Sequence, residues 1–247
     1  MGLVFGSFAN VCIHRIPKNK TSILGRSYCP KCKKKINWYD NIPLISYLIL
    51  SGKCRKCKKN ISIKYFVIEL ISALSFVFIY IYFDNFTEIF YFQIIVLILL
   101  IITFIDYKHF IIPDSLNYSL IILACIYFFI PNIELKFNEN ISQIVIGGLA
   151  GYLSIWLIIF LYKNLKNIEA MGLGDAKLMS AFGCFFGWQS IPVILFLSSI
   201  SGLLFSFSSL LKKKSTLKTK IPFGPHIILG SVAYFVFGEK LFKLIVQ

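Results

Sequence analysis

Eight apolar segments, separated by short polar stretches, constrain this chain more than any other feature of its sequence. They cover about 2–13, 63–83, 88–105, 115–131, 141–161, 174–188, 190–210 and 221–238. A helix needs about 20 apolar residues to cross a bilayer. Several segments reach that length, whereas the first and the sixth are shorter. We therefore predict an all-α, polytopic membrane protein with about eight transmembrane helices in contact with the lipid bilayer.

The composition and the distribution of charge agree with a membrane protein. The chain is 57% hydrophobic and only 15% charged, which soluble domains rarely combine. Its net charge of +15 would also suit a nucleic-acid-binding protein. If the loop 14–64 is cytoplasmic, however, every Lys and Arg except Lys136, Lys240 and Lys243 falls on the cytoplasmic side. The positive-inside rule therefore accounts for the basic residues, and we expect no nucleic-acid partner.

The first apolar segment is followed, not preceded, by basic residues. A cleavable signal peptide has the opposite order. We therefore expect residues 1–13 to form a truncated first transmembrane helix rather than a signal peptide.

Four of the seven cysteines form two CxxC pairs within the loop 14–64, namely Cys29 with Cys32 and Cys54 with Cys57. Two such pairs can close a tetrahedral zinc site, and a reducing cytoplasm disfavours disulfides. Because four thiolates leave no open position on the metal, we predict structural zinc. Unmetallated thiols and two redox pairs are the alternatives.

Two acidic residues lie at the cytoplasmic ends of apolar segments. Asp106 ends the third segment, and Asp175 stands near the start of the sixth, directly after Gly172 and Gly174. A carboxylate at this depth is costly and often functional, and glycines allow a backbone or a substrate to approach closely. Two converging carboxylates share a proton, so one can activate water while the other protonates the substrate. This pattern predicts acid–base cleavage of a peptide bond.

Two further charged residues are candidates for a supporting role. Asp114 follows Pro113 and would equally serve to cap a helix that begins at Ser115. Lys177 lies two residues beyond Asp175 and would equally be a plain interfacial cation.

Taken in order, these motifs closely resemble the bacterial type IV prepilin peptidases, membrane aspartyl proteases of the GxGD type. The matching segments are 6–11 with Arg15 and Pro17, 26–32, 40–44, 52–57, Glu69, Asp106 with 112–114, 172–177, and 221–225. The resemblance covers almost the whole chain. It implies a cytoplasmic four-cysteine zinc loop over 14–64 and a membrane aspartyl protease domain over 65–247. Asp106 and Asp175 are then catalytic, supported by Gly172, Gly174, Asp114 and Lys177.

The resemblance also implies the substrate and a second activity. Such an enzyme cleaves the leader of type IV prepilins or pseudopilins at the cytoplasmic face of the bacterial inner membrane. It then methylates the new amino terminus with S-adenosylmethionine. Our candidates for this second reaction are Gly6, Asn10, Arg15, Asp40, Asn41 and Glu69.

Two of these candidates have a specific physical argument. Glu69 lies about one turn into a helix, where an acid needs a partner or a function. Arg15 or the amine of the substrate would be that partner. Gly6 would equally serve close packing of two helices.

Two other functions compete with this prediction. One is a membrane aspartyl protease without methyltransferase activity, and the intact zinc loop argues against it. The other is a non-enzymatic membrane scaffold or transporter. The order of the motifs argues against this second alternative, as does the lack of a visible inverted repeat.

Overall fold

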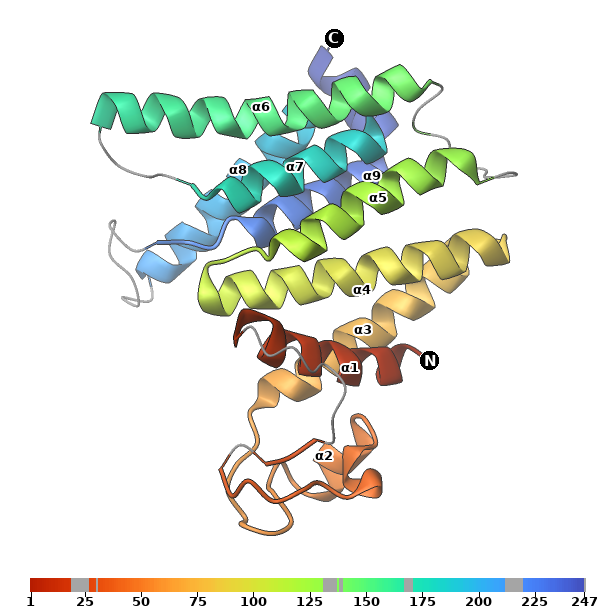
Figure 1. The fold of residues 1–247 in the computed structure, drawn as a ribbon, viewed down its shortest axis with the longest axis vertical. Coiled ribbons are helices and arrows are strands. Elements are labelled where there is room, and N and C mark those ends of the chain that lie inside the picture. Colours follow the sequence, from red (N-terminus) through yellow and green to blue (C-terminus); the bar gives the residue numbers. More distant parts are fainter. Residues whose placement is uncertain are drawn as a thin grey trace. The chain divides into compact units, whose positions relative to one another are not determined.

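The computed structural model describes residues 1–18, 27–29, 31–130, 137, 140–166, 171–211 and 220–246 (Figure 1). Arg26, Lys136 and the lysines of 212–219 lie outside the described residues. The chain divides into two compact units, 1–101 and 102–247. Within the described part, β structure is limited to two isolated antiparallel bridges in the cysteine-containing loop, Tyr28 with Lys35 and Lys53 with Asn60.

The first unit is built on two helices and the loop that joins them. Its elements are α1 (Gly2–Arg15), η1 (Ile16–Lys18), η2 (Trp38–Asn41), α2 (Ile45–Ile49), α3 (Ile63–Tyr82) and the first part of α4 (Phe86–His109). Helix α1 packs along α3 through small residues. The Ser72 hydroxyl donates to the Gly2 carbonyl at 2.8 Å. Close contact of small residues is how helices pair within a bilayer, where burial from water supplies no driving force.

The second unit holds the end of α4 and five further helices. These are α5 (Asp114–Phe129), α6 (Ile141–Lys166), α7 (Leu173–Phe186), α8 (Ser190–Leu211) and α9 (Gly224–Val246). Helix α7 is the most buried and packs against both α5 and α6 (Figure 1). Where α6 crosses α7, Gly147 and Gly183 approach so closely that a Cβ at either would collide with the backbone of the other. These glycines bring α7 into the centre of the unit.

Helix α6 exposes an apolar face, as expected of a helix that faces lipid. Its buried face is formed largely by glycines, including Gly147 and Gly151. Its exposed face carries Ile146, Leu149 and Leu153, each more than half exposed. This arrangement is the reverse of a soluble helix, which buries its large apolar side chains and exposes polar ones. The protein is therefore embedded in a membrane.

Each of the eight predicted apolar segments contains a helix, so the all-α prediction is confirmed. The number of spanning helices is only partly established. Among the described residues, α3, α4, α6 and α8 are long and apolar enough to cross a bilayer. Helices α1 and α7 have 14 residues each, about 21 Å at 1.5 Å per residue. That is shorter than a hydrocarbon core of about 30 Å.

Candidate functional site

Asp106 lies in the last turn of α4 and is buried, with 5% of its surface exposed. Its Oδ2 accepts a hydrogen bond of 3.0 Å from the backbone amide of Gly224, the first residue of α9. The end of a helix is an unfavourable place for an acid, because its unpaired carbonyls are negative, whereas the start of a helix offers unpaired amides. The amide at the start of α9 thus offsets the unfavourable electrostatics of an acid in the last turn of α4.

Asp175 is held in the same way, by the start of its own helix. It is the third residue of α7 and has 8% of its surface exposed. Its Oδ2 accepts a hydrogen bond of 3.2 Å from the amide of Gly172, the residue that caps α7. Its own amide donates to the Gly172 carbonyl at 3.1 Å. An acid in the first turn is stabilised by the helix dipole.

The two predicted aspartates come together although they lie 69 positions apart in the sequence. Asp106 is close enough for its charge to act on the Asp175 carboxylate. Ile112, in the connection between α4 and α5, packs against the start of both α7 and α9. A Cβ on Gly174 would lie 3.0 Å from Ile112 Cβ, and a Cβ on Gly224 would lie 3.0 Å from Ile112 Cδ1.

The two glycines of the GxGD motif differ in how closely they are packed. Gly174 lies tightly against Ile112, so a larger residue there would displace α7 or the connection. A Cβ on Gly172 would make only ordinary contact, 3.7 Å from Asp175 Oδ2. The sequence argument for close approach therefore applies to Gly174, whereas the space beside Gly172 is open among the described residues.

Asp114 and Lys177 form an ion pair of 2.7 Å between α5 and α7. The interpretation of Asp114 as the cap of a helix starting at Ser115 is wrong. The helix begins one residue earlier, Pro113 is its N-cap, and the Asp114 carboxylate is turned to Lys177 instead. Lys177 also lies over the ring of Tyr118, 5.4 Å from its centroid. The pair joins the first turns of the two helices.

A second polar cluster, in the first unit, surrounds Glu69 on α3. Glu69 Oε2 accepts a hydrogen bond of 2.9 Å from the amide of Leu44, and the carboxylate also bonds Ser7. The side-chain amide of Asn10 donates to the carbonyl of Tyr65 at 3.2 Å and lies 3.5 Å from Glu69 Oε1. These partners of Glu69, all within the described residues, are neutral groups.

The Leu44 amide reaches Glu69 because the loop makes an unusual turn there. Leu44 has φ 58° and ψ −51°, and the Ile45 amide donates to the Pro43 carbonyl at 2.6 Å. This is a γ-turn of the strained, positive-φ form. Strained residues of this kind are concentrated at functional sites, where surrounding contacts hold them in place. Sequence reasoning selected Glu69 and Asn10 but missed Ser7 and the Leu44 amide.

The remaining candidates from the amino-terminal half occupy different surroundings. A Cβ on Gly6 would lie 2.8 Å from Glu69 Cα, so the space beside this glycine is filled by α3, as its helix-packing interpretation predicts. Asp40 pairs with Arg55, at 2.8 to 3.0 Å through two guanidinium nitrogens. Asn41 is exposed at the end of η2, and Arg15 is the last residue of α1.

The four predicted cysteine ligands form a group that could hold a metal ion. The sulfurs of Cys29, Cys32, Cys54 and Cys57 all lie within 4.8 Å of one another. The sulfurs of Cys29 and Cys57 are 3.9 Å apart. A tetrahedral zinc site with bonds of about 2.3 Å separates its sulfurs by about 3.8 Å. The donor set and its spacing therefore fit zinc.

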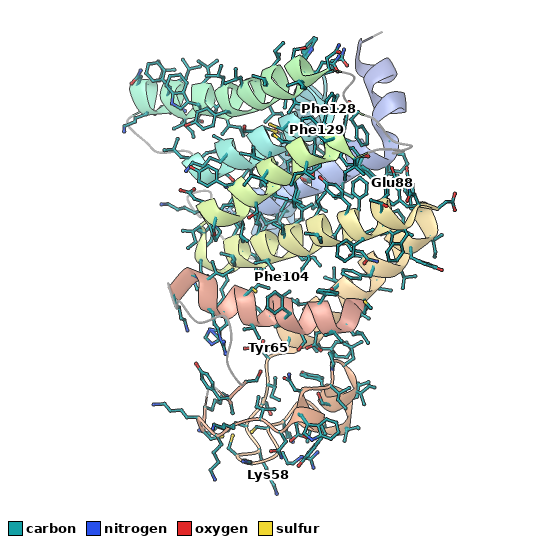
Figure 2. All side chains as sticks on the ribbon, turned by 45° about the vertical axis from the view of Figure 1, so that its right-hand side comes forward. Lys58, Tyr65, Glu88, Phe104, Phe128 and Phe129 are labelled. Atoms are coloured by element: carbon teal, nitrogen blue, oxygen red, sulfur yellow. The ribbon has the colours of Figure 1, made fainter. Side chains whose placement is uncertain are left out.

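Each cysteine pair is presented by the same backbone turn. In the first, the Cys29 amide donates to the Lys34 carbonyl at 3.0 Å, and the Lys33 amide donates to the Cys29 carbonyl at 2.8 Å. The second pair repeats both bonds at the corresponding positions. Lys33 and Lys58 adopt the same positive φ, 56° and 54°, and Figure 2 shows Lys58 in the loop. Such repetition is expected of two halves of one metal site.

The thiols in this group differ in acidity. Burial raises the pKa of Cys29, but hydrogen bonds from the backbone amides of Cys32 and Lys31 and from neighbouring thiols outweigh it and lower the pKa to about 7. The Lys59 amide lowers the pKa of Cys57, whereas burial and the hydrogen bonds shared with the other thiols raise it to about 11. A divalent cation would stabilise thiolates on all four sulfurs.

Two family models match this chain, one over the region that contains Glu69 and the four cysteines, the other over the region that contains Asp106 and Asp175. Residues 1–83 match the bacterial peptidase A24 N-terminal domain, and residues 93–207 match the type IV leader peptidase family. A Vibrio cholerae protein named prepilin leader peptidase/N-methyltransferase is 35% identical over 95% of this chain and 93% of its own length. A Pseudomonas aeruginosa protein with the same name is 30% identical over 100% of this chain and 91% of its own length. No solved structure matches the chain.

Proposed function

Because this chain belongs to the type IV leader peptidase family, we propose that it cleaves the leader peptide of type IV prepilins or pseudopilins and methylates the new amino terminus. The observation that carries the first reaction is the pair formed by Asp106 and Asp175. Both are buried, both accept a hydrogen bond from an amide at the start of a helix, and the charge of Asp106 acts on Asp175.

We assign the two aspartates complementary roles in peptide-bond hydrolysis. Two neighbouring carboxylates hold one proton between them and titrate as a unit. The ionised one takes a proton from a water molecule, whose oxygen attacks the scissile carbonyl carbon. The protonated one donates to the carbonyl oxygen. Collapse of the intermediate breaks the C–N bond: the proton taken from water goes to the leaving amine, and a hydroxyl proton of the intermediate returns to the second carboxylate as the carbonyl re-forms.

The hydrogen bonds at the site suggest which carboxylate atoms react. In each aspartate the backbone amide bonds Oδ2. This fixes the plane of each carboxyl group and leaves Oδ1 for the water and the substrate. Pre-set orientation of this kind is a main source of enzymatic rate enhancement.

We assign the second reaction to the cluster around Glu69, with S-adenosylmethionine as the methyl donor. A buried carboxylate whose described partners are neutral donors suits a positively charged group, such as an ammonium or a sulfonium. S-adenosylmethionine supplies an activated methyl group, and the amine must lose a proton before it can accept that group. Glu69 is placed to receive the proton, with Asn10 and Leu44 holding the carboxylate.

We further propose that the four cysteines bind structural zinc and that this metal serves the second reaction indirectly. The loop that contains the cysteines also contains Leu44, whose amide bonds Glu69. A metal that closes the loop would hold the strained turn at Leu44 against the disorder that a long loop otherwise favours.

The arrangement of charges supports a location in the bacterial inner membrane with both sites facing the cytoplasm. With the cysteine loop inside, nearly all basic residues lie on the cytoplasmic side. The same topology needs all eight apolar helices to cross, including the short α1 and α7. A protease without methyl transfer, or a scaffold or transporter, would not require both polar clusters.

Conservative substitutions of the two acids test the proposal. Asp106→Asn and Asp175→Asn keep the shape of the side chain but remove its acid–base function. Purified variants in lipid are incubated with a prepilin, and the products are read by mass spectrometry. Each should fail to cleave, whereas Asp84→Asn, a control at an exposed aspartate, should cleave normally. Near-normal cleavage by either site variant would refute the assignment.

A further inference from the structure

Asn117, a polar residue that sequence reasoning did not select, lies where α5 meets the start of α7. It is fully buried, and its Nδ2 donates to the carbonyl of Gly174 at 3.2 Å. A carbonyl can only accept a hydrogen bond, so the nitrogen of the amide must face α7 and Oδ1 must point away from it. The acceptor of this bond, Gly174, directly precedes Asp175 in the sequence.

The other end of the same amide is unusual. Asn117 Oδ1 is buried and has no hydrogen-bond partner in the part of the chain that the structure describes. A buried acceptor without a donor destabilises a protein, and an apolar side chain of similar size would avoid this cost. Among the described residues, the Gly174 carbonyl is thus the one hydrogen-bond partner of this buried amide.

The surroundings of Gly174 explain why one hydrogen bond would matter there. Ile112 packs tightly against one side of the glycine, so its backbone cannot shift in that direction. Asn117 supplies a directional bond from α5. The nearby Asp114–Lys177 pair also joins the two helices, but the Asp114 side chain is 57% exposed, and exposed ion pairs contribute little.

We propose that Asn117 is a positioning residue for peptide-bond cleavage. By holding the Gly174 carbonyl it fixes the backbone that carries Asp175, and thereby the direction in which that carboxylate faces Asp106. The inference rests on the proposed protease function. It extends the site to α5, through a residue that touches neither the reacting water nor the substrate.

Two substitutions separate this role from a purely structural one. Asn117→Leu is similar in size but cannot donate. Asn117→Asp is nearly isosteric and can donate to Gly174 only while its carboxyl is protonated. Ser119→Ala, which removes a hydroxyl that bonds its own helix at the Ser115 carbonyl, is the matched control on α5.

The measurement is prepilin cleavage by the full-length enzyme in lipid across a range of pH, with methylation of an already cleaved prepilin as a second readout. Misplacement of a catalytic group by 1 Å costs about 100-fold, so Asn117→Leu should lower kcat by at least about tenfold. KM and methylation should change little, because substrate binding and the first unit are untouched. The activity of Asn117→Asp relative to wild type should fall as pH rises. The control should match wild type.

A wild-type kcat for Asn117→Leu would overturn the inference while leaving the proposed function intact. If Asn117→Leu loses both activities, its fold has failed and Asn117→Asp decides. A pH profile parallel to wild type would then overturn the inference, and a selective loss at high pH would support it. If the wild-type enzyme itself does not cleave prepilin, the proposed function fails, and this inference fails with it.

Discussion

Adding one methyl group at Gly224 should impair cleavage without unfolding the protein. Gly224 is buried at the first position of α9, and its φ lies outside the left-handed region, so alanine can adopt the same backbone. Alanine is also the best helix former, so Gly224→Ala should not destabilise α9. The amide that bonds Asp106 is retained, which makes the perturbation purely steric.

The size of the effect follows from the contacts that the new methyl would make. The added Cβ would lie 2.8 Å from Asp106 Oδ2, whereas ordinary contacts begin at 3.4 Å. Either the carboxylate or α9 must therefore move by about 0.6 Å. Catalytic groups must be held within about 0.5 Å. We therefore expect kcat to fall about tenfold, which corresponds to about 1.4 kcal/mol in the activation barrier.

Gly202→Ala is the matched control for this experiment. A Cβ there would meet nothing closer than 3.8 Å, at His226 and Phe223. Both variants add one methyl to the second unit, but only the methyl at Gly224 would press on Asp106 and Ile112. Cleavage rates and thermal unfolding are measured for both. If Gly224→Ala cleaves as fast as Gly202→Ala at equal stability, the position of the Asp106 carboxylate does not limit the reaction, and our reasoning is wrong.

Three predictions concern the first unit. Cys54→Ser should reduce bound zinc, measured by metal analysis, and make the loop sensitive to protease; zinc content equal to wild type would contradict a four-cysteine site. Because zinc displaces thiol protons, zinc affinity of the unaltered protein should weaken as pH falls, and more steeply below about 7, where Cys29, whose pKa is lowered to about 7, is also protonated. Glu69→Gln should cleave prepilin but leave its new amino terminus unmethylated, because an amide cannot accept the proton of the amine. Normal methylation by this variant, seen in the same mass spectrum, would show that Glu69 is structural.

The helices could be predicted from the sequence because each one needs an apolar surface that the bilayer can cover. Each predicted apolar segment therefore contains a helix, whereas the number of helices that cross the bilayer stays a prediction, and the helix lengths were less certain. The sequence segment 221–238 begins before Pro222, whereas α9 begins at Gly224 and runs to Val246. Helix α7 has 14 residues and packs between α5 and α6 in the centre of its unit. The pattern of apolar residues does not reveal this central position.

The identities of the acids could also be predicted, but their partners could not. Asp106 bonds an amide 118 positions away in the sequence, and Glu69 bonds one 25 positions away. Every residue except proline carries a backbone amide, so no pattern of side chains distinguishes the amides that serve a site. The same limit explains Asn117, which looks like any polar residue near the start of a helix until its contact with Gly174 is known.

The acids at these sites fall into two groups according to what holds them, and the difference bears on function. Asp40 and Asp114 pair with the full positive charges of an arginine and a lysine. Asp106, Asp175 and Glu69 accept hydrogen bonds from backbone amides. A neutral donor fixes the direction of a carboxylate while adding no full charge that would oppose protonation. Acids that must gain and lose protons in each reaction cycle are best held by such donors, and these three are the ones to which we assign chemistry.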